Sequence, residues 1–161
     1  MRRGFTLLEM VLTIGILATI FLVGLQANTI LQNTLASRGA RQMESVLDVA
    51  ALRARNGVGG TNWGVYFAYD NTTRVASQAI LFSGNTYATR DTTKDISFSF
   101  GRDLKFTNVS LQGAGASTGN DHEIDFTFLS GTTSQYGSVT IASYASTTVI
   151  SIPAIGIAVR N

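Results

Sequence analysis

Cysteine is absent from the 161 residues, and proline, tryptophan and histidine occur once each. The absence of cysteine excludes a disulfide framework, a thiol nucleophile and a cysteine-ligated metal. Charged residues make up 14% of the chain, against roughly 25% in an average soluble domain. A chain of this length suffices for one ordinary domain, so the low charge content points to a hydrophobic segment within it.

The net charge of +2 overstates how basic the chain is. Arg2 and Arg3 supply two of the twelve basic side chains, against ten acidic ones. If the chain is cut after Gly4, ten basic side chains face ten acidic ones. This balance predicts no general electrostatic attraction to nucleic acid or to acidic lipid.

The hydrophobic segment lies at the N-terminus. Met1-Arg2-Arg3-Gly4 precedes a run of 21 residues, Phe5 to Leu25, in which Glu9 is the single charge. About 20 apolar residues suffice to cross a bilayer as a helix. Arginines before the segment and none within it predict a cytoplasmic N-terminus. We therefore expect a single-pass cytoplasmic (inner) membrane protein whose remaining domain lies outside.

The segment has two simpler interpretations. A secretory signal peptide would have a shorter apolar core followed by a small-residue cleavage site, and this sequence shows neither. A plain membrane anchor explains everything except Glu9, because a carboxylate at mid-membrane costs about 2.5–3.5 kcal/mol on insertion scales. Near the interface Glu9 can snorkel to water, which is the structural alternative to a functional role.

Gly4-Phe5-Thr6-Leu7-Leu8-Glu9 resembles the cleavage and methylation motif of type IV prepilins and type II secretion pseudopilins. The match includes the short basic leader, the glycine before the cut, the phenylalanine after it and the glutamate four residues beyond. It covers about the first 30 residues. The resemblance implies cleavage between Gly4 and Phe5 by a prepilin peptidase, followed by N-methylation of Phe5.

The same resemblance implies a role for Glu9 in assembly. Cleavage creates a positive amine on Phe5, and Glu9 lies about one helical turn further along. Glu9 of one subunit would neutralise the Phe5 amine of its neighbour. In a low-dielectric filament core, such pairing removes most of the penalty of an isolated charge.

Helical periodicity continues beyond the apolar segment to about Arg55, and Asn56-Gly57 and Gly59-Gly60 are predicted to end the helix. Small and apolar residues recur at helical steps through this stretch: Leu31, Leu35, Gly39, Met43, Val46, Leu47, Ala50 and Ala54. We expect a close approach of a sheet at Gly39. No proline interrupts the helix, and Gly15 and Gly24 are interpreted as sites of bending or of close helix packing.

The periodicity changes from helical to alternating at Trp63. Seven or eight short strands are predicted at residues 63–69, 75–82, 96–100, 104–111, 124–128, 139–141, 149–152 and 155–159. The predicted fold class is α+β: a long N-terminal α-helix, with a membrane-spanning first half, packed on an antiparallel β-sheet or a two-sheet β domain.

This order, with Trp63-Gly64-Val65-Tyr66-Phe67 as the first strand, resembles the GspH/FimT-like minor pilins and pseudopilins. The expected domain organisation follows from it. We expect a leader peptide at residues 1–4, a transmembrane and filament-core helix at 5–25, its continuation at 26–56 and an extracytoplasmic β-rich pilin head at 57–161.

No catalytic constellation stands out, so we expect no enzyme activity and no cofactor. His122 has no obvious nucleophile near it in sequence and is interpreted as a polar residue of a loop or strand edge. The glycine-rich stretch 113–119 is followed neither by a lysine at P-loop spacing nor by a helix pattern. It is interpreted as a flexible loop.

Asp121, Glu123 and Asp125 alternate, which on a strand places three carboxylates on one face. Hard oxygen ligands suit calcium, and these residues are the candidate metal ligands of the sequence. The triplet is short, lacks the familiar calcium-loop pattern and faces opposite Ile124 and Phe126. The favoured interpretation is a solvated strand face without a metal.

The expected function is that of a minor pilin or pseudopilin. Its partners would be the prepilin peptidase, other pilin subunits and, indirectly, an assembly platform protein and a motor ATPase. The alternatives are a major pilin, an adhesive surface subunit or a DNA-binding FimT-like minor pilin. DNA binding is disfavoured because the basic residues 90, 94, 102 and 105 are interleaved with acidic residues 91, 95 and 103.

Overall fold

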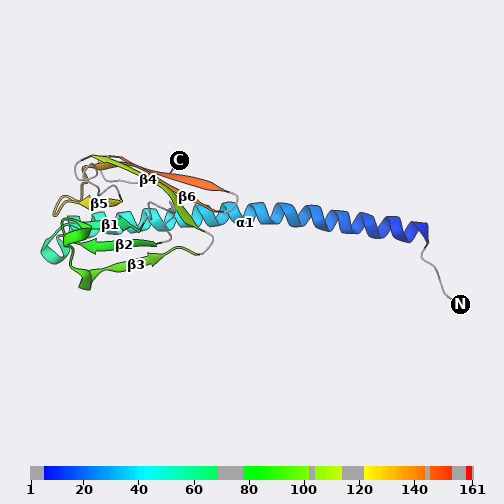
Figure 1. The fold of residues 1–161 in the computed structure, drawn as a ribbon, viewed down its shortest axis with the longest axis horizontal. Helices are drawn as coiled ribbons and strands as arrows, with labels where there is room; N and C mark the ends of the chain where they lie inside the picture. The colour runs from blue at the N-terminus through cyan, green and yellow to red at the C-terminus, as the bar shows by residue number, and fades with distance from the viewer. Residues whose placement is uncertain are drawn as a thin grey trace.

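Helix α1 (Leu7–Arg55) forms the N-terminal third of the computed structural model, and its first half projects away from the sheets (Figure 1). Its 49 residues span about 74 Å at 1.5 Å per residue. The helix is continuous through Gly15 and Gly24. The structure describes residues 6–68, 78–101, 104–113, 122–143, 146–153 and 159–160, without the side chains of 25–33 and 159–160.

α1 ends at the glycines that the sequence predicted. Asn56 caps it, and Gly57 follows with a φ of 66°, a left-handed conformation that glycine adopts without steric penalty. The short helix η1 (Val58–Gly60) then leads into the first strand. Its Val58 carbonyl accepts a hydrogen bond of 2.7 Å from the indole N–H of Trp63.

The described residues contain eight strands, which form two four-stranded antiparallel sheets. The first has the order β3-β2-β1-β5. Its strands are β1 (Trp63–Phe67), β2 (Gln78–Ser83), β3 (Ile96–Ser99) and β5 (Glu123–Phe126). Two short helices, η2 (Tyr87–Thr89) and η3 (Thr92–Lys94), connect β2 to β3. β5 is therefore an edge strand, although it follows β4 in the sequence.

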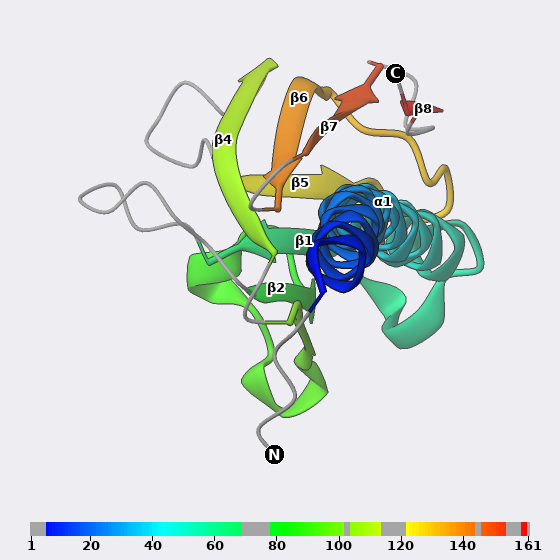
Figure 2. The ribbon, with the colours of Figure 1, turned by 90° about the vertical axis from the view of Figure 1, so that its right-hand side faces the viewer.

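The second sheet has the order β4-β6-β7-β8. Its strands are β4 (Lys105–Gly113), β6 (Gln135–Ala142), β7 (Thr147–Ile152) and β8 (Val159–Arg160). The C-terminal half of α1 contacts strands of both sheets, and Figure 2 shows it end-on beside them. The expected α+β class, a helix packed on antiparallel sheet, is confirmed.

The helix contributes a continuous buried stripe to the core. Its fully or almost fully buried members are Ala36, Ala40, Met43, Val46, Leu47, Ala50 and Ala54. Gly39 lies in the same stripe, where an added Cβ would come within 2.8 Å of Leu104 Cδ1 and 3.6 Å of Ile141 Cγ2. The close approach predicted at Gly39 is therefore confirmed.

The strand predictions differ from the structure mainly at their ends. β6 begins at Gln135, four residues before the predicted start. Its first residue is polar but only 2% exposed, and a buried polar side chain is not signalled by apolar alternation. The described residues of β8 are Val159–Arg160. The predicted strand residues 69, 75–77 and 155–158 lie outside the described residues.

Candidate functional site

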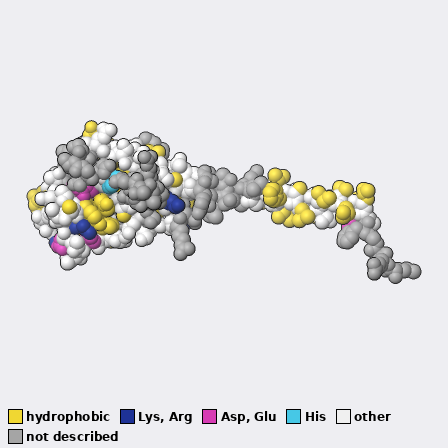
Figure 3. All heavy atoms as spheres, in the orientation of Figure 1, with side chains coloured by type: hydrophobic (Ala, Val, Ile, Leu, Met, Phe, Trp, Pro, Cys, Tyr) yellow, Lys and Arg dark blue, Asp and Glu magenta, His cyan; other side chains and the backbone are white. Residues whose placement is uncertain are grey.

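The projecting half of α1 carries an unburied apolar surface. Leu7–Gly24 is long and apolar enough to cross a membrane, and none of it is buried against the rest of the described chain. Leu8 is 78% exposed and Phe21 is 67% exposed, and Figure 3 shows the apolar side chains along this rod. A patch this large is not left facing water. This surface requires lipid or other protein around it.

The first turn of α1 is closed by a capping box. Thr6 Oγ1 accepts from the backbone N–H of Glu9 at 3.3 Å, and Glu9 Oε2 accepts from the backbone N–H of Thr6 at 3.5 Å. A negative side chain at this position also favours the positive end of the helix dipole. The Thr6-x-x-Glu9 spacing is the sequence signal from which this cap could have been predicted.

The capping box places the carboxylate of Glu9 at the N-terminal end of the helix, beside the segment that precedes it. Gly4 and Phe5 lie outside the described residues. The cap also gives Glu9 a local structural role, in addition to any role in assembly. A test of Glu9 must therefore separate capping from charge.

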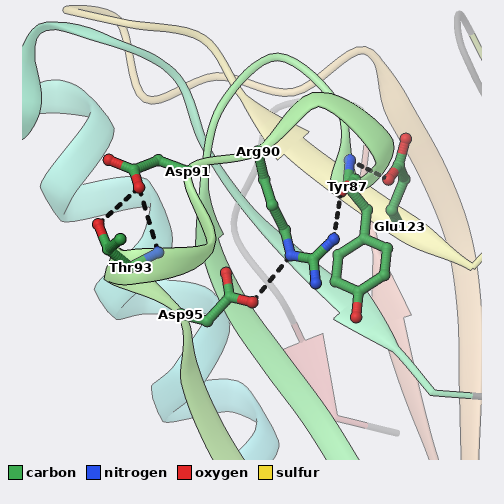
Figure 4. A network of polar contacts seen from close by, with 6 residues as sticks. All are labelled: Tyr87, Arg90, Asp91, Thr93, Asp95 and Glu123. Carbon is green, nitrogen blue, oxygen red and sulfur yellow. Dashed lines mark hydrogen bonds and ion pairs between the residues drawn. The ribbon is translucent and has the colours of Figure 1, made fainter.

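A polar network covers the outer side of the first sheet (Figure 4). Glu123 Oε2 accepts from the backbone N–H of Tyr87 at 2.7 Å. Arg90 donates from Nη1 to the Tyr87 carbonyl at 2.7 Å and from Nε to Asp95 Oδ2 at 2.8 Å. The bond to Glu123 joins the η2 segment to β5, and the two Arg90 bonds join η2 to the residue that precedes β3.

Aromatic rings reinforce the same network. The Tyr87 ring stacks on the Tyr66 ring with centroids 3.7 Å apart, and the Arg90 guanidinium carbon lies 3.6 Å from the Tyr87 centroid. The hydrogen bond to Asp95 raises the pKa of Arg90. Burial opposes this rise, and the charges of Tyr87, Asp95 and Tyr66 add smaller contributions to it. The guanidinium is thus committed to contacts within the head.

The prediction that the acidic triplet forms a solvated strand face is wrong. Glu123 is 3% exposed, Asp125 is half-buried, and Asp121 lies outside the described residues. Both described carboxylates are covered because the η2 segment folds over β5 and because Gln135 reaches across from β6. Gln135 donates to Asp125 Oδ2 at 3.4 Å and accepts from the Asp125 backbone N–H at 2.6 Å.

Burial changes the pKa of both Glu123 and Asp125. It raises the pKa of Glu123, and the hydrogen bond from Tyr87 opposes this only in part. Burial, followed by the charge of Glu123, raises the pKa of Asp125 to about 7, despite the hydrogen bond from Gln135. Glu123 Oε1 and Asp125 Oδ1 are buried and have no hydrogen-bond partner among the described residues. Folding therefore raises the pKa of both carboxyl groups above their ordinary values.

The structure gathers no metal centre in the part of the chain that it describes. No group of three or more His, Asp or Glu side chains is placed there to hold an ion. His122 precedes β5, as expected of a residue near a strand edge, but it is buried rather than exposed, at 8%. Of the predicted glycine-rich loop, Gly113 ends β4 and residues 114–119 lie outside the described residues.

The basic residues considered for DNA binding are largely paired with acids. Arg90 lies 2.8 Å from Asp95, and Lys94 lies 3.1 Å from Asp91. Hydrogen bonds from Thr93, and then from Lys94, lower the pKa of Asp91. Of the other two, Lys105 is exposed on β4 and residue 102 lies outside the described residues. The described surface therefore shows no uncompensated cluster of these cations.

Comparison of the chain with protein-family models, with curated proteins and with solved structures finds no match.

Proposed function

We propose that this chain is a structural subunit of a type IV pilin-like filament, a minor pilin or pseudopilin of a type IV pilus or of a type II secretion or competence pseudopilus. The observation that carries the proposal is the division of one continuous helix. Residues 7–24 are apolar and unburied, while the C-terminal half of the same helix forms part of the core of a β-rich head. Such a helix joins the head rigidly to whatever surrounds its apolar half.

In this proposal the chain is first a membrane protein and then a filament subunit. The N-terminus is cytoplasmic, and the head lies outside the cytoplasmic (inner) membrane. The prepilin peptidase cleaves between Gly4 and Phe5, and the amine of Phe5 is methylated. A platform protein and a motor ATPase then move the subunit into a periplasmic or extracellular filament, where other pilins replace lipid around the apolar helix.

Glu9 has a specific task in this scheme. Its carboxylate holds the Thr6 N–H in the uncleaved chain. Cleavage after Gly4 creates an ammonium group on the residue next to Thr6. That cation is a stronger partner than a neutral amide, and in an apolar helix bundle the pairing of the two charges offsets their desolvation. Glu9 would exchange its cap for the amine of a neighbouring subunit.

N-terminal sequencing of the protein from its native host tests the cleavage. A mature chain that begins with methylated Phe5 supports the proposal, and Gly4→Leu should leave the leader attached because the added side chain blocks close approach to the peptide bond. A wild-type chain that still begins at Met1 would refute the proposed processing.

The role of Glu9 is tested by Glu9→Gln and Glu9→Val. Glutamine can keep the capping bond but removes the charge, whereas valine removes both. We expect both variants to be cleaved and both to be depleted from sheared filaments by at least about tenfold, which corresponds to about 1.4 kcal/mol per assembly step. Glu44→Gln is the matched control on the same helix. Normal incorporation of Glu9→Gln would refute the charge-pairing role.

A further inference from the structure

The second sheet has a face that is turned away from α1. Its strands β4, β6 and β7 lie side by side (Figure 2). Side chains alternate across a strand, and those of Val109, Val139 and Ile150 join the helix in the core. The residues between them point outward and form three rows across the sheet: Asn108, Thr140 and Val149 in the first, Ser110, Ser138 and Ser151 in the second, and Gln112 and Tyr136 in the third.

We call these eight residues the neutral face. All eight are exposed or half-buried, and none is charged. The charged residue Lys105 lies beyond the first row, at the start of β4. Nucleic acid and acidic lipid are bound through cations, and a basic partner is bound through acids. The neutral face offers neither, so a ligand that matches it is uncharged.

The side chains of the neutral face have hydrogen-bonding capacity to offer. Five of them make no hydrogen bond to another described residue: Asn108, Ser110, Gln112, Ser138 and Thr140. Hydroxyl and amide groups both donate and accept. An apolar ligand would cover these groups without replacing the hydrogen bonds they make to water, which is costly. The matching ligand is therefore rich in groups that also donate and accept.

Tyr136 gives the neutral face an aromatic ring. It is 43% exposed, lies opposite Gln112 on β4 and is two residues from Ser138 on β6. A tyrosine side chain combines an apolar ring face with a polar hydroxyl. A sugar ring has the complementary form, with apolar C–H groups on its faces and hydroxyl groups around its edge.

We propose that the neutral face binds an uncharged polysaccharide. A sugar ring lies over Tyr136, and its hydroxyl groups exchange hydrogen bonds with Gln112 and Ser138. Successive rows are about 6.8 Å apart along a strand, and neighbouring strands are about 4.8 Å apart. Such a flat array of repeated hydroxyl and amide groups fits a polymer that repeats its own hydroxyl groups.

The inference goes beyond the proposed function. The neutral face lies on the side of its sheet opposite α1, so a filament with α1 at its centre would turn this face outward. Only that placement rests on the proposed function. Binding itself is a property of the single chain and is measured without a filament.

Co-sedimentation of the full chain with insoluble polysaccharides tests the inference. The chain is purified in a detergent without a sugar headgroup and mixed with microcrystalline cellulose, chitin or insoluble starch, and heparin–agarose is the charged counterpart. We expect at least one neutral polymer to retain the chain at least fivefold more than heparin–agarose does. Because no charge takes part, about 1 M salt should change this retention less than twofold.

Substitutions separate the neutral face from the rest of the head. Tyr136→Ala should lower retention at least fivefold, whereas Tyr136→Phe keeps the ring and should lower it less than twofold. Ser138→Lys places a charge in the middle row and should also lower retention at least fivefold. Leu129→Ala and Ser45→Lys are the matched controls at exposed sites elsewhere, and they should bind like the wild type. The urea midpoint, read from Trp63 fluorescence, shows that each variant is folded.

Three results would overturn the inference. The first is no retention by any of the three neutral polymers. The second is retention that about 1 M salt abolishes, which means binding through charge. The third is equal retention of the wild type and of folded Tyr136→Ala and Ser138→Lys. N-terminal sequencing keeps the two proposals apart, because a chain that begins at Met1 and still binds a neutral polymer refutes only the proposed processing.

Discussion

Asp125→Asn should stabilise the head, and increasingly so as the pH rises from 4 to 8. Asp125 is half-buried beside Glu123, and its Oδ1 has no hydrogen-bond partner in the part of the chain that the structure describes. Ionising it therefore costs more in the folded head than in the unfolded chain. Asparagine keeps nearly the same shape, can still accept the hydrogen bond from Gln135 through its amide oxygen, and never ionises.

The magnitude follows from the two pKa values of Asp125. Its ordinary value is 3.8 and its folded value is about 7, a difference worth up to about 4 kcal/mol. Because the side chain is not fully buried, water relaxes part of this penalty, and we expect about 2–4 kcal/mol at pH 8.

The pH window follows from the raised folded pKa of Asp125. Below about pH 4 the carboxyl is protonated in both states, so the wild type pays no penalty there. Between pH 4 and 7 the unfolded chain releases the proton while the folded head retains it, and stability falls as the pH rises. Above pH 7 both states are ionised and the difference becomes constant.

Unfolding of the full chain by urea in detergent micelles, followed by tryptophan fluorescence, measures this difference. Trp63 is the one tryptophan of the chain and is 3% exposed in the folded head, so its emission reports loss of the core. Asp48→Asn makes the same substitution at an exposed site and serves as the control. If Asp125→Asn has the same unfolding midpoint as the wild type at both pH 4.5 and pH 8, the burial argument fails.

Two further predictions concern the head. Gly137 has a φ of 148°, and a Cβ there would overlap the Ser110 carbonyl oxygen of β4. Gly137→Ala should therefore lower the free energy of unfolding by about 2–4 kcal/mol. The control is Gly101→Ala, where no atom lies within 4 Å of an added Cβ, and it should change the free energy of unfolding by less than about 1 kcal/mol. Equal urea midpoints for the two variants would contradict this. Millimolar calcium at pH 8 should leave the melting temperature unchanged. The reason is that Tyr87 already donates a hydrogen bond to one oxygen of Glu123, and Gln135 to one oxygen of Asp125. A reproducible rise in the melting temperature would restore the interpretation of these acids as metal ligands.

Local periodicity was enough to predict most of the fold. The buried stripe of α1, its end at Asn56-Gly57 and the presence of eight strands follow from spacing along the chain, because helices and strands repeat over a few residues. The tight contact at Gly39 was predicted for the same reason.

The acidic residues of β5 show what the sequence by itself did not determine. It established that Glu123 and Asp125 share a face, because side chains alternate along a strand. Only the tertiary structure decided that this face is covered, because the covering groups come from η2, 36 positions from Glu123, and from Gln135, ten positions from Asp125. Alternation fixes a side chain's direction within its strand, whereas its contact with solvent depends on segments brought there by the fold of the whole chain.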